Sequence, residues 1–234
     1  NEINKNFPSL KIVLANYFDC FGENLETVLA LPVHTLHLDL VRCSSQLDDI
    51  LESGKLTNTV NLSLGVVDGR NIWKNDFKKS LALIEKATNA IGKDRVLIAS
   101  SCSLIHSPCD LDLETNDATL TPEIKQWLAF AKQKIEEIVL LQNFALEEAS
   151  LVDSVSFQEN TIANENRKTS KLIHNEEVKN RVASITKGDD ERENPFSIRR
   201  KKQIDALNLP LFPTTTIGSF PQTTEVRSWR AKFK

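Results

Sequence analysis

The sequence of 234 residues contains no methionine and does not begin with one, which predicts a fragment or a processed chain. No run approaches 18 apolar residues, so the sequence offers no candidate for a membrane-spanning helix. The opening NEINKNFPSL lacks the basic and apolar regions of an export signal. The formal net charge is −3, so the sequence lacks the excess of positive charge that is typical of nucleic-acid-binding proteins. These absences leave an ordinary soluble globular protein, expected in the cytoplasm.

Cysteine is also sparse. The four cysteines, Cys20, Cys43, Cys102 and Cys109, form no C-x-x-C pair and have no paired-histidine motif. In a chain without an export signal, they are expected to be reduced thiols rather than a disulfide framework.

The first half of the chain alternates between two apolar patterns. Short segments rich in Val, Ile and Leu predict buried parallel strands at residues 10–18, 35–42, 59–67 and 95–103. Helical spacing predicts helices at residues 24–31, 45–51 and 75–91, and Gly54 and Gly92 are candidate helix stops. The alternation is typical of a βα repeat.

A longer helix is predicted from residue 121 to about residue 148, with Thr121 as N-cap and Pro122 in its first turn. Its apolar stripe is read as Ile124, Trp127/Leu128, Ala131, Ile135, Ile138/Val139 and Gln142. Residues 150–208 are polar, with short helices at residues 175–185 and after Asn194-Pro195, and predict a surface connector. Residues 209–220 return to strand character.

The fold class is therefore α/β, with four βα units, which are half of an eight-stranded (βα)8 barrel, plus a helical linker. An open doubly wound sheet is the competing fold. That fold usually carries a Gly-rich ligand loop after a strand, and this sequence has neither a G-x-G-x-x-G nor a Walker pattern. The half-barrel is favoured.

Chemistry in such a barrel sits on the loops that follow the strands. These loops begin at residues 19–24, 39–43, 67–71 and 100–106, and each carries a carboxylate, an Arg, a Cys or a His. An active-site rim would have this composition. Strand ends are polar for structural reasons as well: Asp39 and Arg42 could simply pair, and Asp68-Gly69 is an ordinary turn. Position alone favours the structural interpretation.

Cys20, Asp39, Cys102 and His106 follow different strands and could form a metal-binding set, but no tight pair such as H-x-C supports one. Structural roles are again favoured. His37 is predicted to be a core or barrel-lumen histidine with a backbone partner. His34 lies in a loop, and His174 is predicted to be solvated. Trp73 and Trp127 are interpreted as packing anchors on helices.

Several runs, taken together, carry a resemblance that spans nearly the whole chain. They include NYFDCFGENLETVLALPV, LGVVDGRNIW, SSCSLIHSPCDLDLE and LPLFPTTTIGSFPQT. The sequence resembles the cobalamin-independent methionine synthase family. The resemblance implies two (βα)8 barrels, face to face. Residues 1–149 would be the second half of the N-terminal barrel, 150–208 the linker, and 209–234 the start of the C-terminal catalytic barrel with its first strand.

The activity implied by this resemblance is methyl transfer from 5-methyltetrahydropteroyltri-L-glutamate to L-homocysteine, giving L-methionine. The family uses zinc, which keeps the thiol substrate deprotonated and nucleophilic. Its zinc, its catalytic acid and most of its homocysteine site belong to the C-terminal barrel. We therefore expect no catalytic residue and no metal ligand in this chain, and expect the chain to be inactive alone.

Ile217, Gly218 and Ser219 match the family segment that contacts the amino-acid moiety of homocysteine or methionine. Gly218 would let the backbone approach closely, and the Ser219 hydroxyl could hold a carboxylate. A strand-to-loop turn that needs glycine is the structural alternative. The family's duplication also makes Cys20, Asp39 and Cys102 candidate relics of a zinc set, but the matching histidine is missing and Arg70 replaces another. No zinc site is predicted in this half-barrel.

A function of another class stays open, namely a non-catalytic folate-tail-binding or scaffold module. A half-barrel also leaves open sheet edges and an apolar layer. We expect the remainder of the same polypeptide or a second copy to cover them. The implied partners are thus L-homocysteine, the folate polyglutamate and this covering segment, without nucleic acid or membrane.

Overall fold

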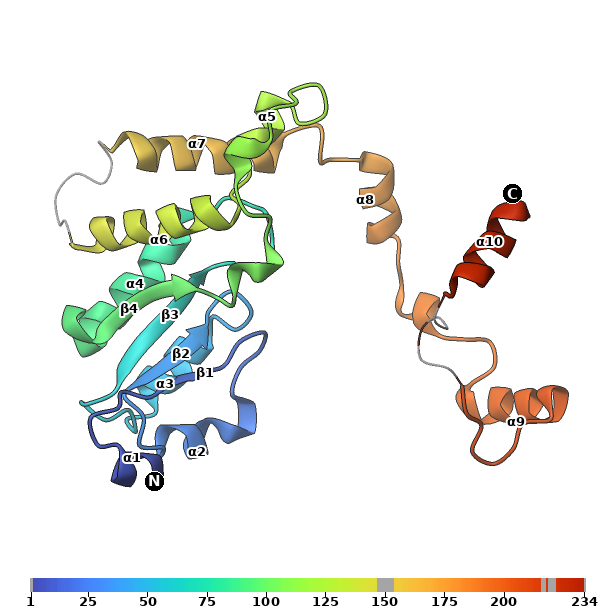
Figure 1. Ribbon diagram of the computed structural model, residues 1–234, viewed down its shortest axis with the longest axis horizontal. Coiled ribbons are helices and arrows are strands. Elements are labelled where there is room, and N and C mark those ends of the chain that lie inside the picture. Colours follow the sequence, from blue (N-terminus) through green and yellow to red (C-terminus); the bar gives the residue numbers. More distant parts are fainter. Residues whose placement is uncertain (1, 147–153, 216–217, 219–221, 234) are drawn as a thin grey trace. The chain divides into compact units, whose positions relative to one another are not determined.

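Four parallel strands form one sheet in the order β1-β2-β3-β4 (Figure 1). The computed structural model describes residues 2–146, 154–215, 218 and 222–233. The chain divides into two units, Asn1–His174 and Asn175–Lys234. The sheet belongs to the first unit, and it is open, because β1 and β4 each pair with one neighbour.

All four predicted strands are confirmed, each shorter than predicted. They are β1 (Val13–Ala15), β2 (Thr35–Asp39), β3 (Asn61–Val67) and β4 (Val96–Ser100). The helices between them are α2 (Leu25–Leu29), α3 (Gln46–Glu52) and α4 (Phe77–Ile91). Gly92 ends α4 as predicted, and the Asp76 side chain caps its start by accepting the Lys79 N–H. The α/β fold is that of part of a (βα)8 barrel.

The two faces of the sheet differ in character. Leucines on one face pack with α3, α4 and α6 to form the core: Leu36, Leu38, Leu62 and Leu64. The alternating residues are polar and also buried. His37 and Ser63 are register partners, and their Nδ1 and Oγ atoms lie 3.0 Å apart. The His37 Nε2 lies 3.2 Å from the Ser101 carbonyl oxygen, which confirms the predicted backbone partner.

The single long helix predicted from residue 121 is wrong. α5 (Pro122–Lys125) ends after one turn, and α6 (Ala131–Leu146) begins after an extended segment. That segment pairs with the loop after β3: Leu128 forms an antiparallel bridge with Trp73, and Ala129 donates to the Ile72 carbonyl at 2.9 Å. The backbone therefore exchanges helical hydrogen bonds for bonds to a distant segment. Thr121 does cap α5, as predicted.

The predicted apolar stripe is wrong in part: Trp127 and Leu128 are buried and Ile138 packs against the core, but other members of the stripe within α6 face outward. Ile135 and Val139 are 54% and 50% exposed. The side chains that face inward are Lys134, Glu137, Leu141 and Phe144. The helix is rotated from the predicted orientation because Lys134 and Glu137 find polar partners in the loop after β3.

Two helices of the first unit have no counterpart among the predicted helix ranges. α7 (Val155–Thr169) packs on α4 and α6, and the Phe157 ring lies 5.9 Å from that of Phe144 (Figure 1). α1 (Glu2–Asn6) precedes the sheet. None of the helices in the described ranges combines the length and apolar character needed to cross a membrane.

The second unit consists of α8 (Glu176–Ala183), α9 (Phe196–Leu207) and α10 (Thr224–Lys232), with loops between them. The predicted caps are confirmed for α8, where Asn175 accepts two backbone N–H groups. The strand expected within residues 209–220 is not formed by its described part, residues 209–215 and 218. A strand needs a partner strand for its backbone groups, and the described part of this unit offers none.

Candidate functional site

The carboxyl ends of the four strands lie at one edge of the sheet, since all four are parallel. Asp39, at the end of β2, is 1% exposed and joins two of the loops there. Its Oδ2 accepts the Phe18 N–H at 2.8 Å, and its Oδ1 accepts the Val41 and Arg42 N–H groups at 3.1 and 2.9 Å. The carboxylate therefore contacts the Arg42 backbone, and the structural interpretation of Asp39 is the one that the geometry supports.

Asp68, after β3, has a similar role. Its Oδ1 accepts the Arg70 N–H at 2.8 Å, and its Oδ2 accepts from the Asn71 side-chain amide at 2.7 Å. This is the predicted turn, closed by an aspartate that bonds to the backbone two residues on.

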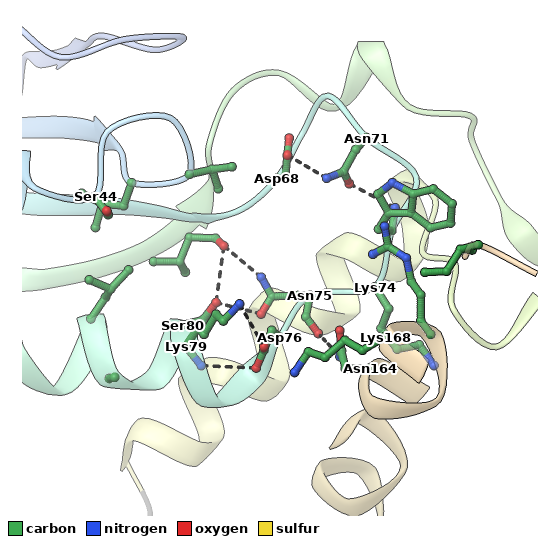
Figure 2. A pocket seen from close by; sticks show the side chains of 18 residues that line it. Ser44, Asp68, Asn71, Lys74, Asn75, Asp76, Lys79, Ser80, Asn164 and Lys168 are labelled. Carbon is green, nitrogen blue, oxygen red and sulfur yellow. Dashed lines mark hydrogen bonds and ion pairs between the residues drawn. The ribbon is translucent and has the colours of Figure 1, made fainter. Parts of the chain in front are cut away.

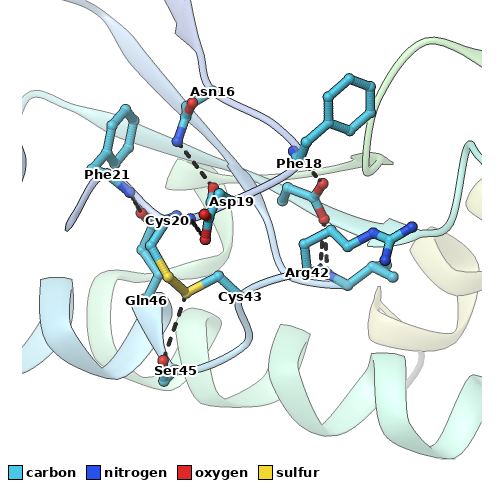
Figure 3. Close-up of a disulfide and its surroundings, with 11 residues drawn as sticks. Asn16, Phe18, Asp19, Cys20, Phe21, Arg42, Cys43, Ser45 and Gln46 are labelled. Atoms are coloured by element: carbon cyan, nitrogen blue, oxygen red, sulfur yellow. Dashed lines mark hydrogen bonds between the residues drawn. A yellow bond between two sulfur atoms is a disulfide. The ribbon is translucent and has the colours of Figure 1, made fainter. Parts of the chain in front are cut away.

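Cys20 and Cys43 form a disulfide with Cα atoms 5.5 Å apart, so the prediction of reduced thiols is wrong for this pair (Figure 3). The sequence separates them by 23 residues, but neighbouring parallel strands end side by side and bring their following loops within disulfide reach. Cys102 is a buried free thiol, and Cys109 is an exposed one.

The candidate metal set is not assembled. Cys20 is in the disulfide, and the Asp39 oxygens are occupied by backbone N–H groups. Burial raises the pKa of the Cys102 thiol, which disfavours the thiolate that a metal requires. His106 lies beside the Phe18 ring, at 6.0 Å. In the described ranges, no group of three or more His, Cys, Asp or Glu residues could hold a metal ion.

A cluster around Phe18 was not predicted. This residue has φ 80°, a left-handed conformation that is strained for a bulky side chain. The Arg70 guanidinium lies 4.4 Å from the centre of its ring, and the Tyr17 ring lies 4.8 Å away. Three strand ends therefore contribute to one aromatic and cationic rim. The strain at Phe18 is held by its N–H bond to Asp39.

Hydrogen bonds of Asn75 hold the loop after β3 in place. Its backbone N–H donates to Glu137 Oε1 at 2.8 Å, and its side-chain amide donates to the Val66 carbonyl at 2.9 Å. Its carbonyl accepts from the side-chain amides of Asn160 and Asn164 on α7, at 2.8 and 3.0 Å. Asn75 therefore joins β3, α6 and α7.

Two buried charges of α6 support the same loop. Lys134 is fully buried and donates to Asn71 Oδ1 at 3.2 Å and to the Trp73 carbonyl at 3.0 Å. Burial lowers its pKa. Burial also raises the pKa of Glu137 to about 7, although the Asn75 N–H and the Lys134 charge act in the opposite direction. The burial of these two side chains was not predicted, because charged residues on a helix normally face solvent.

The tryptophans are only partly as predicted. Trp127 is 3% exposed and packs as an anchor, with its indole N–H donating to Asn166 Oδ1 at 2.7 Å. Trp73 lies in the loop before α4, and the guanidinium of Arg167 lies 3.7 Å from its ring centre. Neither tryptophan lies on a helix, contrary to the prediction.

Of the candidate amino-acid site, Ile217 and Ser219 lie outside the described residues. Gly218 has φ +75°, in the left-handed region that favours glycine, and a Cβ there would meet nothing within 4 Å. In this structure glycine is thus needed for its backbone conformation rather than to avoid a clash.

Comparisons with known proteins agree with the resemblance noted from the sequence. Residues 1–92 match a family model described as the N-terminal domain of cobalamin-independent synthase, and residues 212–234 match one described as its catalytic domain. A 5-methyltetrahydropteroyltriglutamate–homocysteine methyltransferase of Flavobacterium johnsoniae is 77% identical over 234 residues, which are 100% of this chain and 30% of that protein.

Proteins of the same name from Cytophaga hutchinsonii and Saccharomyces cerevisiae are 54% and 46% identical, over 97% and 95% of this chain and 29% and 28% of theirs. The chain thus spans about 30% of the length of these relatives. With matches to both of the family's domains in their expected order, the chain belongs to the cobalamin-independent methionine synthase family.

Proposed function

We propose that these 234 residues are part of a cytoplasmic, zinc-dependent and cobalamin-independent methyltransferase. The reaction is transfer of the methyl group from 5-methyltetrahydropteroyltri-L-glutamate to L-homocysteine, which yields L-methionine. One observation carries the proposal: a relative named for this reaction is 77% identical along the whole chain. The order of the two family domains within one chain supports it.

We propose that the chain consists of three segments, residues 1–149, 150–208 and 209–234. The first segment is the second half of the N-terminal barrel, the second is the linker, and the third opens the catalytic barrel. The described residues do not fit a zinc site, because no group of three suitable ligands occurs among them. We therefore assign zinc and the catalytic acid to the rest of the catalytic domain.

Methionine formation tests this assignment. A polypeptide that continues through the catalytic domain should form methionine from homocysteine and the triglutamate folate, and the 234 residues alone should not. An inactive longer protein that still binds the folate tail would favour the alternative, a non-catalytic binding or scaffold module. Stoichiometric, tight zinc binding by the 234 residues would contradict the assignment of zinc elsewhere.

The amino-acid moiety of homocysteine is proposed to contact Ile217, Gly218 and Ser219. The left-handed backbone at Gly218 supports this role, since it turns the chain without a side chain that would cover neighbouring N–H groups. Replacing Ser219 by Ala in the longer protein should raise the KM for homocysteine roughly tenfold, as expected for one lost hydrogen bond to a carboxylate. An unchanged KM would refute the contact.

The open sheet also implies a covering partner. Val13 of β1 and Leu97 of β4 are 59% and 45% exposed. We infer that the remainder of the same polypeptide, or a second copy, covers these edge strands. Low binding of a hydrophobic dye by a monomeric 234-residue protein would contradict this inference.

A further inference from the structure

A groove of about 910 Å³ lies between the loop after β3, the start of α4 and the second half of α7 (Figure 2). Its volume is within the range of small-molecule sites. The reaction proposed above assigns no role to it, and every residue that lines it belongs to the first unit.

The groove carries an excess of positive charge. Four cationic side chains line it, Lys74, Lys79, Arg167 and Lys168, against two carboxylates. Both carboxylates already have partners. Asp68 accepts from the turn that it closes, and Asp76 caps α4 and lies 3.6 Å from the Lys79 ammonium.

Two of the four cations have no direct ion pair, although the charge of Lys74 acts on Glu137 from a distance. Lys168 pairs with Glu165 at 2.6 Å, and Lys79 pairs with Asp76. Arg167 and Lys74 form no ion pair within the described part of the chain. Figure 2 places Lys74 on the same side of the groove as Lys168 and Asn164.

Arg167 is the more informative of the two. Its guanidinium lies over the Trp73 ring at 3.7 Å, and none of its N–H groups donates to a described residue. Burial lowers the pKa of Arg167, and no neighbouring carboxylate counters this effect. A guanidinium held flat against an aromatic ring is pre-organised, and its free edge can bind a carboxylate with two parallel hydrogen bonds.

The rest of the lining combines the polar side chains of Ser44, Asn71, Asn75, Ser80 and Asn164 with an apolar surface. Val41, Leu83 and Ile173 come from the end of β2, from α4 and from the segment after α7. Val41 and Ile173 are 39% and 48% exposed, so they offer surface to a ligand. A ligand complementary to this groove has an anionic end and an apolar body.

We propose that this groove binds an organic carboxylate with an apolar body, whose carboxylate pairs with Arg167 and Lys74 while its body lies along Val41, Leu83 and Ile173. The proposal does not depend on the methyltransferase reaction, because it rests only on the charges and the apolar surface that line the groove.

The test uses the 234-residue protein with its three tryptophans labelled with ¹⁵N. The probe is 3-phenylpropionate, with neutral 3-phenylpropanamide and inorganic phosphate as comparisons. Titration with 3-phenylpropionate should shift the indole signal of Trp73, identified by its loss in Trp73→Phe, with a Kd on the order of 1 mM for so small a ligand. The amide and phosphate should each bind at least roughly tenfold more weakly.

Arg167→Gln and Lys74→Gln should each weaken binding of 3-phenylpropionate roughly tenfold or more, as expected for a lost charge-assisted hydrogen bond. Arg167→Lys, which keeps the charge, should retain part of the affinity. Lys171→Gln is the matched control, since it removes a nearby charge that does not line the groove, and it should change nothing. An unchanged Trp127 signal shows that the first unit of each variant is folded.

Three results would overturn the proposal. Equal binding of the amide would exclude the carboxylate, and equal binding of phosphate would exclude the apolar body. No shift of Trp73 with any probe would mean that the groove is closed to small ligands or is occupied by an acidic segment of protein.

Discussion

The buried carboxylate of Glu137 should make the protein less stable as the pH rises from about 5 to about 7. Burial raises the pKa of Glu137 from 4.5 to about 7, so the folded state holds the proton more tightly than the unfolded state does. The stability linked to this proton is fully present below pH 4.5 and is lost as the pH rises through 7. Glu137→Gln removes the titration and keeps the acceptor for the Asn75 N–H.

The magnitude follows from the two pKa values. Between pH 5 and pH 7, the free energy of unfolding of the unmodified protein should fall by about 2 kcal/mol because of Glu137 alone. The lowered pKa of Lys134 has the opposite sign: the unfolded state holds the lysine proton more tightly, so this contribution to stability rises with pH.

Urea unfolding at pH 5, 6 and 7, followed by circular dichroism, measures this slope. From pH 5 to pH 7, the free energy of unfolding of Glu137→Gln relative to that of the unmodified protein should increase by about 2 kcal/mol. Glu85→Gln, which changes an exposed carboxylate on α4 that does not act on the pKa of Glu137, should leave the slope unchanged. The same slope in Glu137→Gln as in the unmodified protein would refute the assignment of a raised pKa to this burial.

Three further predictions concern stability. Lys134→Met leaves Asn71 Oδ1 and the Trp73 carbonyl without their donor and should lower the free energy of unfolding by about 2 kcal/mol. The variant should also lose stability with rising pH beyond pH 7, because it removes a charge that lowers the pKa of Glu137. Cys43→Ser opens a disulfide that spans 23 residues and should lower the free energy of unfolding by about 3 kcal/mol under oxidising conditions, measured by urea unfolding. Gly65→Ala would place a Cβ 2.7 Å from backbone atoms on both sides of β3 and should cost about 3 kcal/mol, seen as a lower Tm.

The cysteine and glycine changes each have a matched control. Cys109→Ser alters an exposed free thiol and should not change stability. With a reducing agent present, Cys43→Ser and the unmodified protein should unfold alike, and a persistent difference would point to a lost packing contact. Gly188→Ala adds a Cβ that meets only a side-chain oxygen at 3.9 Å, and a Tm as low as that of Gly65→Ala would contradict the backbone clash.

The elements of the βα repeat could be predicted from the sequence because their signals are local. Val, Ile and Leu runs gave the four strands, and Asn175 and Thr121 gave helix caps. The wrong predictions concern segments whose backbone forms hydrogen bonds with a distant part of the chain. The helix predicted from residue 121 breaks because Leu128 and Ala129 bond to the loop after β3.

The candidate site divides in the same way. Chain order and parallel strands placed Asp39, Asp68 and Cys102 at one edge of the sheet, as predicted. No pattern in the sequence indicated that Cys20 and Cys43 would bond, since their approach depends on which strands are neighbours. The strained backbone conformation of Phe18 could not be predicted from the sequence either, because it depends on a hydrogen bond to the distant residue Asp39.

The sequence by itself determined the βα alternation, the helix caps and the family, because these depend on residue order and local hydrogen bonding. Only the tertiary structure decided which face of α6 is buried. Apolar periodicity placed Ile135 and Val139 inside, whereas the fold buries Lys134 and Glu137. The physical reason is that the loop after β3 exposes backbone and amide groups that need partners inside the protein, and two charged side chains supply them.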